Sequence, residues 1–243
     1  MRSLHSRPIR AVSAAILSGL LVLSATGCAL VFGDDPEISD LSQAAADSPR
    51  FFEGHDTALL ESNDIVPIAE NPEPRLPVSF TGLDDVTVEI ADTSRILALD
   101  GTGSLASIVF GLGFGPSVVG RDLTTGFDSA KDLPLVMNGH SLNAEAILEL
   151  NPTLILTDYS VGPYDVQLQM RNSGIPIVFF EPAENLDEIP RLISDVATAL
   201  GVPELGELYV DDFDRRLADT LARIEAVVPE REEDRVRMVF LYM

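Results

Sequence analysis

The segment Arg95-Ile-Leu-Ala-Leu-Asp-Gly-Thr-Gly-Ser-Leu-Ala106 decides the fold predicted for this chain. Residues 95–99 form a short and almost entirely apolar run, which is typical of a strand buried on both faces. The two glycines that follow permit a tight turn, and a helical pattern begins at Ser104. A buried strand that leads through a glycine turn into a helix predicts a βαβ unit with a parallel sheet.

The same alternation continues toward the C-terminus. The helix at 143–150 stops before Asn151-Pro152, and the helix at 165–173 stops at Gly174, a frequent residue just after helices. The sequence therefore predicts an α/β lobe over residues 93–182, with a mainly parallel sheet flanked by helices. Its strands are expected at 95–99, 117–120, 133–137, 153–157 and 176–180, and its first helix at 104–112.

Residues 183–228 change to a purely helical pattern. Apolar residues recur at steps of three or four from Leu205 to Val228, which predicts a helix of about 24 residues and roughly 36 Å. We expect this helix to connect the lobe to a second one, whose first strand lies within residues 235–243. Because a strand without neighbours leaves an apolar edge unpaired, we expect the natural product to continue beyond Met243.

The N-terminal residues have the features of an export signal. Three arginines precede an apolar run over residues 11–25, which is too short for a comfortable membrane span. Ser24-Ala-Thr-Gly-Cys28 resembles a bacterial lipobox with Ala25 in place of the usual leucine, so Cys28 would carry a diacylglycerol. We expect residues 1–27 to be a lipoprotein signal peptide and the mature protein to be extracytoplasmic and membrane-anchored. An ordinary signal peptide with an incidental cysteine is the alternative.

The mature chain is strongly acidic. Residues 1–27 hold three of the 16 basic residues and none of the 39 acidic ones, which argues against nucleic acid as a partner. Fifteen acidic residues lie between Asp34 and Asp92, opposed only by Arg50 and Arg75, and several prolines interrupt the same stretch. This composition predicts a solvated acidic tether over residues 28–92.

One loop has the spacing of a dinucleotide-binding turn. Gly101-x-Gly103-x-x-Ala106 follows a predicted strand, and Asp122 lies where an acidic residue would bind the ribose hydroxyls. The alternative is a simple tight turn between strand and helix. An NAD-type nucleotide-binding enzyme is thus one hypothesis, although an exported protein does not meet cytoplasmic nicotinamide cofactors.

A second loop, Asn138-Gly139-His140-Ser141, lies after a predicted strand, where open α/β sheets bind ligands. Imidazole is the commonest metal-ligating side chain, and a neighbouring glycine lets a flat ligand approach the backbone. A solvated loop histidine is the alternative. No Gly-x-Ser-x-Gly nucleophile turn accompanies the histidine, so no catalytic constellation is predicted.

Four segments together resemble the N-terminal lobe of a haem-binding lipoprotein of a bacterial ABC importer, within the wider group of siderophore- and cobalamin-binding proteins. Asn-Ala-Glu-Ala-Ile-Leu and Asn-Pro-Thr-Leu are typical of the wider group, and the preceding Gly-His narrows the match to haem. The resemblance covers residues 95–243. The segments are Arg95-Ile-Leu-Ala-Leu-Asp-Gly-Thr-Gly-Ser-Leu105, Val119-Gly-Arg-Asp122, Asn138-Gly-His-Ser-Leu-Asn-Ala-Glu-Ala-Ile-Leu148 and Asn151-Pro-Thr-Leu-Ile-Leu156.

The resemblance implies a site between two lobes joined by a rigid helix. In such proteins a histidine and a tyrosine coordinate ferric haem iron from opposite faces, which places these roles on His140 and Tyr242. Tyr242 could also be an ordinary strand tyrosine. Tyr159 and Tyr164, with Gly139, would contact the haem in the cleft, or the two tyrosines would be packed loop aromatics.

The resemblance also implies a non-catalytic receptor that delivers haem, as transported ligand, to an ABC permease and its ATPase. Glu145 would pair with an arginine of the permease. At the start of a helix this carboxylate is also stabilised by the helix dipole without any partner. A siderophore, cobalamin or another iron chelate is the alternative ligand.

Overall fold

The computed structural model describes residues 57, 59–60, 62–138, 141–237 and 239. Its centre is a three-stranded parallel sheet in the order β3–β6–β7. The strands are β3 (Ile96–Leu99), β6 (Leu154–Thr157) and β7 (Ile177–Phe179), and every residue in them is buried. These strands confirm the sequence prediction, because continuous apolar runs are what a sheet covered on both faces requires.

The sheet continues beyond β3 only through isolated parallel bridges. Ile96 pairs with Val118, and Arg121 pairs with Leu135. The strands expected at 117–120 and 133–137 are therefore wrong as full strands. Ser117 belongs to a short 3₁₀ helix, η3 (Gly115–Ser117), which has Pro116 in its first turn, and Pro134 has no N–H for a ladder. The end of the second segment instead forms an antiparallel hairpin of β4 (Met137–Asn138) and β5 (Ser141–Leu142).

Helices cover both faces of the sheet, so the predicted α/β class is confirmed. One face packs against α2 (Ser104–Gly111) and α5 (Ile189–Ala199). The other face packs against α3 (Ala144–Glu149) and α4 (Tyr164–Asn172). Side chains alternate between the faces, since Ile96 and Ala98 belong to the first core and Leu97 and Leu99 to the second.

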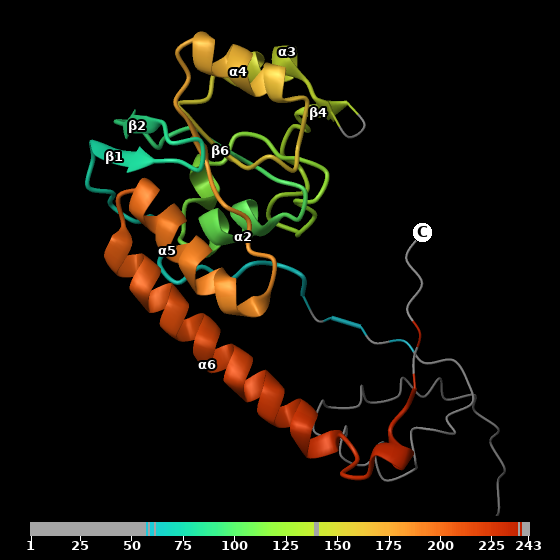
Figure 1. Ribbon diagram of the computed structural model, residues 1–243. Coiled ribbons are helices and arrows are strands. Elements are labelled where there is room, and N and C mark those ends of the chain that lie inside the picture. Colours follow the sequence, from blue (N-terminus) through green and yellow to red (C-terminus); the bar gives the residue numbers. More distant parts are fainter. Residues whose placement is uncertain (1–56, 58, 61, 139–140, 238, 240–243) are drawn as a thin grey trace, which may run out of the picture. The chain divides into compact units, whose positions relative to one another are not determined.

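The long helix is α6 (Pro203–Val227), which follows α5 after a short turn (Figure 1). Its first part packs on the core through Leu205, Tyr209 and Phe213. Farther along, Leu221 and Ile224 are about half exposed. Two short 3₁₀ helices lie in this part of the chain, η4 (Leu186–Glu188) and η5 (Glu232–Asp234). Val236, Arg237 and Val239 of the strand predicted at 235–243 lie outside any strand. Residues 238 and 240–243 fall outside the described residues.

The acidic tether does not extend to residue 92 as predicted. β1 (Val78–Thr81) and β2 (Thr87–Ile90) form an antiparallel hairpin, and Ile90 is fully buried in the core. Upstream, residues 65–77, here called the N-terminal strap, lie along the domain. The Ile68 N–H donates to the Gly111 carbonyl at 2.7 Å and the Arg75 N–H to the Gly201 carbonyl at 2.9 Å. The alternating apolar residues of β1 and β2 pack on the core, and this packing stabilises the hairpin although acidic residues and prolines surround it.

Gly113 lies directly against the N-terminal strap, and we expect that only glycine fits at this position. Its φ is +90°, and a Cβ there would overlap the carbonyl oxygen of Ala69 in the strap. Gly174 has a similar φ of +86° but no atom within 4 Å of the Cβ position. We therefore expect Gly174→Ala to cost about 1–2 kcal/mol of unfolding free energy, the cost of a left-handed backbone. Gly113→Ala should cost more and speed hydrogen exchange at the Ile68 amide.

Urea unfolding and amide hydrogen exchange of the two variants test this role. Equal losses of stability, with unchanged protection of the Ile68 amide in both variants, would contradict the contact between Gly113 and the strap.

Candidate ligand-binding site

The loops that follow the parallel strands meet at one edge of the sheet, here called the carboxyl edge. They begin at Asp100 after β3, at Asp122 after the bridge residue Arg121, and at Asp158 after β6. The Asp100 N–H donates to the Asp122 carboxylate at 2.9 Å, and the Gly101 N–H donates to Ser160 Oγ at 2.6 Å. This is the edge at which open parallel sheets bind ligands.

The β4–β5 hairpin is attached to the carboxyl edge. Asn138 pairs with Ser141, and the two residues that connect them in the sequence, Gly139 and His140, lie outside the described residues. The Leu142 N–H donates to the Gly162 carbonyl at 2.7 Å, which ties the hairpin to the loop after β6. The structure thus brings the flanks of the predicted histidine loop to the loop that carries Tyr159. The role of His140 stays a prediction.

Tyr159 and Tyr164 form an aromatic cluster with Phe179. The ring of Tyr159 stacks on Phe179 with centroids 4.9 Å apart, and the two tyrosine rings are 5.6 Å apart. Tyr159 is 52% exposed and Tyr164 is 44% exposed. Both are therefore packed aromatics on one side, and each keeps part of its surface free for another contact.

The glycine turn at the start of α2 is closed by Asp100. The N–H groups of Gly103 and Ser104 each donate to the Asp100 carboxylate at 3.0 Å. A pyrophosphate would need these donors, and it would meet the negative charge of Asp100 at the same place. The cavity between this turn and Asp158 has a volume of only about 10 Å³, enough for about one water molecule.

Asp122 is equally unavailable for a nucleotide. Its side chain is fully buried and accepts hydrogen bonds from the N–H groups of Asp100, Thr124 and Thr125 at 2.8–2.9 Å. A carboxylate that is fully buried and already engaged by these donors is not accessible to ribose hydroxyls. The geometry therefore favours a structural turn over the dinucleotide hypothesis for residues 101–106.

Two buried carboxylates at the carboxyl edge affect the pKa of a third, Asp100. Asp100, Asp122 and Asp158 are all buried. The pKa of Asp100 is raised, chiefly because burial disfavours its charged form; the hydrogen bond from Thr102 opposes the rise, and the charges of Asp122 and Asp158 add to it. This cluster was not predicted, although each aspartate has a Gly, Thr or Ser within the next two residues, which is a pattern typical of turns.

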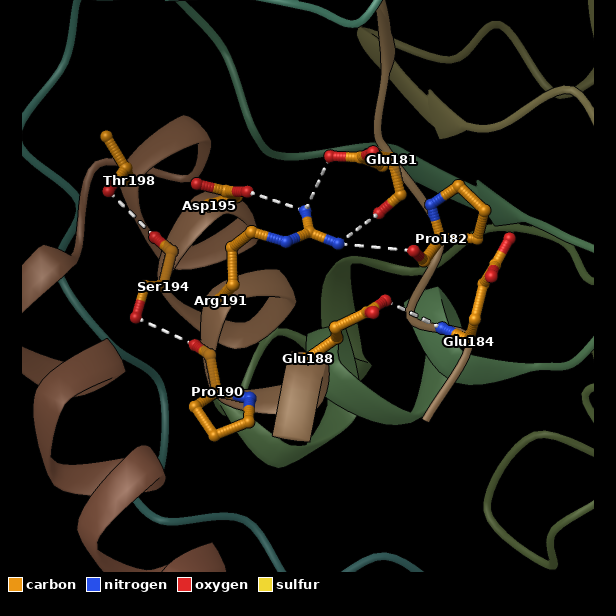
Figure 2. A network of polar contacts seen from close by, with 9 residues as sticks. All are labelled: Glu181, Pro182, Glu184, Glu188, Pro190, Arg191, Ser194, Asp195 and Thr198. Atoms are coloured by element: carbon orange, nitrogen blue, oxygen red, sulfur yellow. Dashed lines mark hydrogen bonds and ion pairs between the residues drawn. The ribbon is translucent and has the colours of Figure 1, made fainter. Parts of the chain in front are cut away.

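The loop after β7 is fixed by Arg191, as Figure 2 shows. Its Nη2 donates to the carbonyls of Glu181 and Pro182 at 3.2 and 3.1 Å. Its Nη1 lies 3.2 Å from the Asp195 carboxylate and 3.8 Å from that of Glu181. The positive charge of Arg191 is therefore already compensated by its own neighbours.

Glu145 lies in the first turn of α3 and is exposed. Asn143 caps this helix, because its Oδ1 accepts hydrogen bonds from the N–H groups of Glu145 and Ala146 at 3.1 and 3.2 Å. Among the described residues, no basic side chain lies within ion-pair distance of Glu145. Its carboxylate is thus available to a partner. Cys28 and Tyr242 fall outside the described residues.

Two further findings limit what the described residues do by themselves. They contain no group of three or more His, Cys, Asp or Glu side chains arranged to hold a metal ion. In the same part of the chain, no helix has the length and apolar character of a transmembrane span. The described residues form a three-layer α/β domain, and the carboxyl edge of its sheet is the candidate site.

Residues 101–241 match the family model described as periplasmic binding protein, and the chain belongs to this family. Membership implies an extracytoplasmic location and a binding role. The vitamin B12-binding protein of Pectobacterium atrosepticum is 29% identical over 141 residues, which are 58% of this chain and 50% of that protein. The chain thus spans about half the length of this relative.

Solved structures of haem-binding proteins are also similar. The crystal structure of the heme binding protein HmuT is 36% identical with a TM-score of 0.69, over 71% of this chain and 56% of that one. A variant of HmuT with a tyrosine replaced by alanine is 34% identical with a TM-score of 0.75, over 81% of this chain and 61% of that one. Together with the family match, these likenesses confirm the predicted group of periplasmic binding proteins that includes haem- and cobalamin-binding members.

Proposed function

We propose that this chain belongs to a lipid-anchored, extracytoplasmic protein that captures ferric haem and delivers it to an ABC permease and its ATPase. The observation that carries the proposal is the β4–β5 hairpin. It attaches the ends of the Asn138-Gly-His-Ser141 loop to the carboxyl edge of a lobe similar to HmuT. A histidine loop at this edge is the feature that a haem receptor needs.

The proposed iron ligands have matching chemistry. The Tyr242 phenolate would be a hard anionic donor suited to Fe(III), and a neutral His140 imidazole would complete the axial pair. Gly139 would let the porphyrin approach the backbone, and the exposed sides of Tyr159 and Tyr164 would add aromatic contacts. Because the interior of the carboxyl edge is closed, the ligand would lie on its surface and be covered by a second lobe.

Features outside the proposed haem site also fit capture and delivery of haem. α6 exposes apolar side chains beyond its contact with the core, as a helix that leads to a second lobe would. Covering haem between two lobes would remove apolar porphyrin surface from water at about 25 cal/mol per Å². Cys28 would anchor the protein to the membrane through lipid, and Glu145 would pair with an arginine of the permease. No step involves nucleic acid or catalysis.

A corrinoid is the second candidate ligand. It is favoured by one observation, the 29% identity to a vitamin B12-binding protein. The histidine loop favours haem over this alternative.

Titration of the full natural gene product with ferric haem, and separately with vitamin B12, tests the proposal. We expect a saturable one-to-one shift of the haem Soret band, because axial ligation changes the porphyrin spectrum. Vitamin B12 should bind much more weakly. A Soret band that does not change saturably on titration would overturn the haem proposal, and tight binding of vitamin B12 would favour the corrinoid.

A further inference from the structure

We infer that Arg121 binds a carboxylate of the ligand and thereby selects carboxylate-bearing tetrapyrroles. This inference rests on the proposed function. The first step is position. Arg121 forms a parallel bridge with Leu135, and the Val136 N–H donates to its carbonyl at 3.0 Å. It therefore lies at the carboxyl edge, beside the segment that runs directly into the β4–β5 hairpin.

The second step is the state of its guanidinium. Nη1 donates to the Asp122 carbonyl at 3.2 Å, which holds the end of the side chain at the carboxyl edge. Nε is buried and has no hydrogen-bond partner. Among the described residues, no carboxylate lies within 4.0 Å of the guanidinium. A partly buried cation in this state gains from an incoming anion.

The third step is a comparison with the other arginine of this edge. Arg191 is engaged by Asp195, Glu181 and two carbonyls (Figure 2), so it has little left to offer a ligand. Arg121 has the positive charge without the carboxylates. This contrast singles out Arg121 as the available cation of the carboxyl edge in the part of the chain that the structure describes.

The fourth step is charge balance. The chain has a formal net charge of −23, and three buried aspartates lie at the same edge. A ligand that carries carboxylates is repelled by such a surface unless a local cation compensates. Haem carries two propionate groups, whereas the side chains of vitamin B12 end in amides. A guanidinium recognises a carboxylate through paired charge-assisted hydrogen bonds, so Arg121 would favour haem over its uncharged analogues.

The test uses the full natural gene product and two probes, ferric haem and ferric haem dimethyl ester, titrated in the same detergent. We expect Arg121→Gln to weaken haem binding about tenfold or more and to leave binding of the diester unchanged, because the diester has no carboxylate. Arg121→Lys should retain part of the preference. The matched control is Arg215→Gln, which removes the same charge from α6, where Arg215 pairs with Asp212.

Each outcome decides between defined alternatives. If Arg121→Gln weakens the binding of both probes equally, or of neither, the carboxylate contact is overturned, while the proposal that the protein binds haem still stands. An equal effect of Arg215→Gln would show that overall charge is responsible, and it would also overturn the inference. If the unsubstituted protein binds neither probe, the proposed function fails and this inference fails with it. Urea unfolding of Arg121→Gln must match the parent protein, so that a folding defect is not read as lost recognition.

Discussion

Replacing His140 by alanine is expected to weaken the binding of ferric haem by about 100-fold or more, which corresponds to ~2.7 kcal/mol. The reason is that His140 is proposed to supply one of two axial ligands. Changes to residues that merely support a metal ligand already cost about 10–100-fold in affinity, so loss of the ligand itself should cost at least as much. Haem titration of the full natural gene product, followed by the Soret band, measures both the affinity and the change of ligation.

Two matched variants make this result specific. Tyr242→Phe retains the ring but removes the phenolate, so it should weaken haem binding and shift the Soret band differently from His140→Ala. Ser141→Ala changes the neighbouring exposed residue of β5 and should leave both affinity and spectrum unchanged. An unchanged spectrum and affinity in His140→Ala would rule out His140 as a ligand.

The central sheet could be predicted from the sequence because its strands are buried on both faces. Strands β3, β6 and β7 lie within the predicted runs, and α2, α3 and α4 agree with their predicted bounds to within one or two residues. Asn151-Pro152 and Gly174 also mark the ends of α3 and α4 in the sequence, because glycine and proline commonly follow the last turn of a helix. Local sequence was therefore sufficient for strands that are buried on both faces and for helices whose ends are marked by glycine, asparagine or proline.

Prediction failed where burial depends on distant partners. The alternating apolar residues of β1 and β2 are surrounded by acidic residues and prolines, and only their packing on the core shows that they are strands. The N-terminal strap is likewise defined by contacts with Gly111 and Gly201, which lie far along the chain. The average composition of residues 28–92 is acidic and rich in proline, so it indicates neither the β1–β2 hairpin nor the N-terminal strap.

The candidate site was predictable only in part. The histidine loop was found because its position after a strand is visible in the sequence. The neutralisation of Arg191, and the absence of a described carboxylate within ion-pair distance of Arg121, depend on which side chains the fold brings together. The same holds for the glycine turn, whose spacing fits a nucleotide site although Asp100 and Asp122 occupy its donors.

The strongest effect on stability is expected from Asp122→Ala. Asp122 accepts from the buried N–H groups of Asp100 and Thr125 as well as from Thr124, and alanine would leave these donors without a partner. Each unsatisfied buried donor costs about 1–3 kcal/mol, so we expect a total loss of ~3–5 kcal/mol. This is a large share of the 5–15 kcal/mol that stabilises a typical domain. Urea unfolding measures the loss directly.

Matched variants separate hydrogen bonding from charge in this result. Asp122→Asn keeps one acceptor oxygen and should lose less stability than Asp122→Ala, and Asp132→Ala on the surface should change stability by no more than about 0.5 kcal/mol. Removing the Asp122 charge should also lower the pKa of Asp100, because that charge now raises it. An Asp122→Ala protein as stable as the Asp132→Ala control, with an unchanged Asp100 pKa by carbon-13 NMR, would show that Asp122 does not organise the carboxyl edge. The expected order of stability, Ala below Asn below the parent, follows from the number of acceptor oxygens that each side chain offers to the buried N–H groups of Asp100 and Thr125.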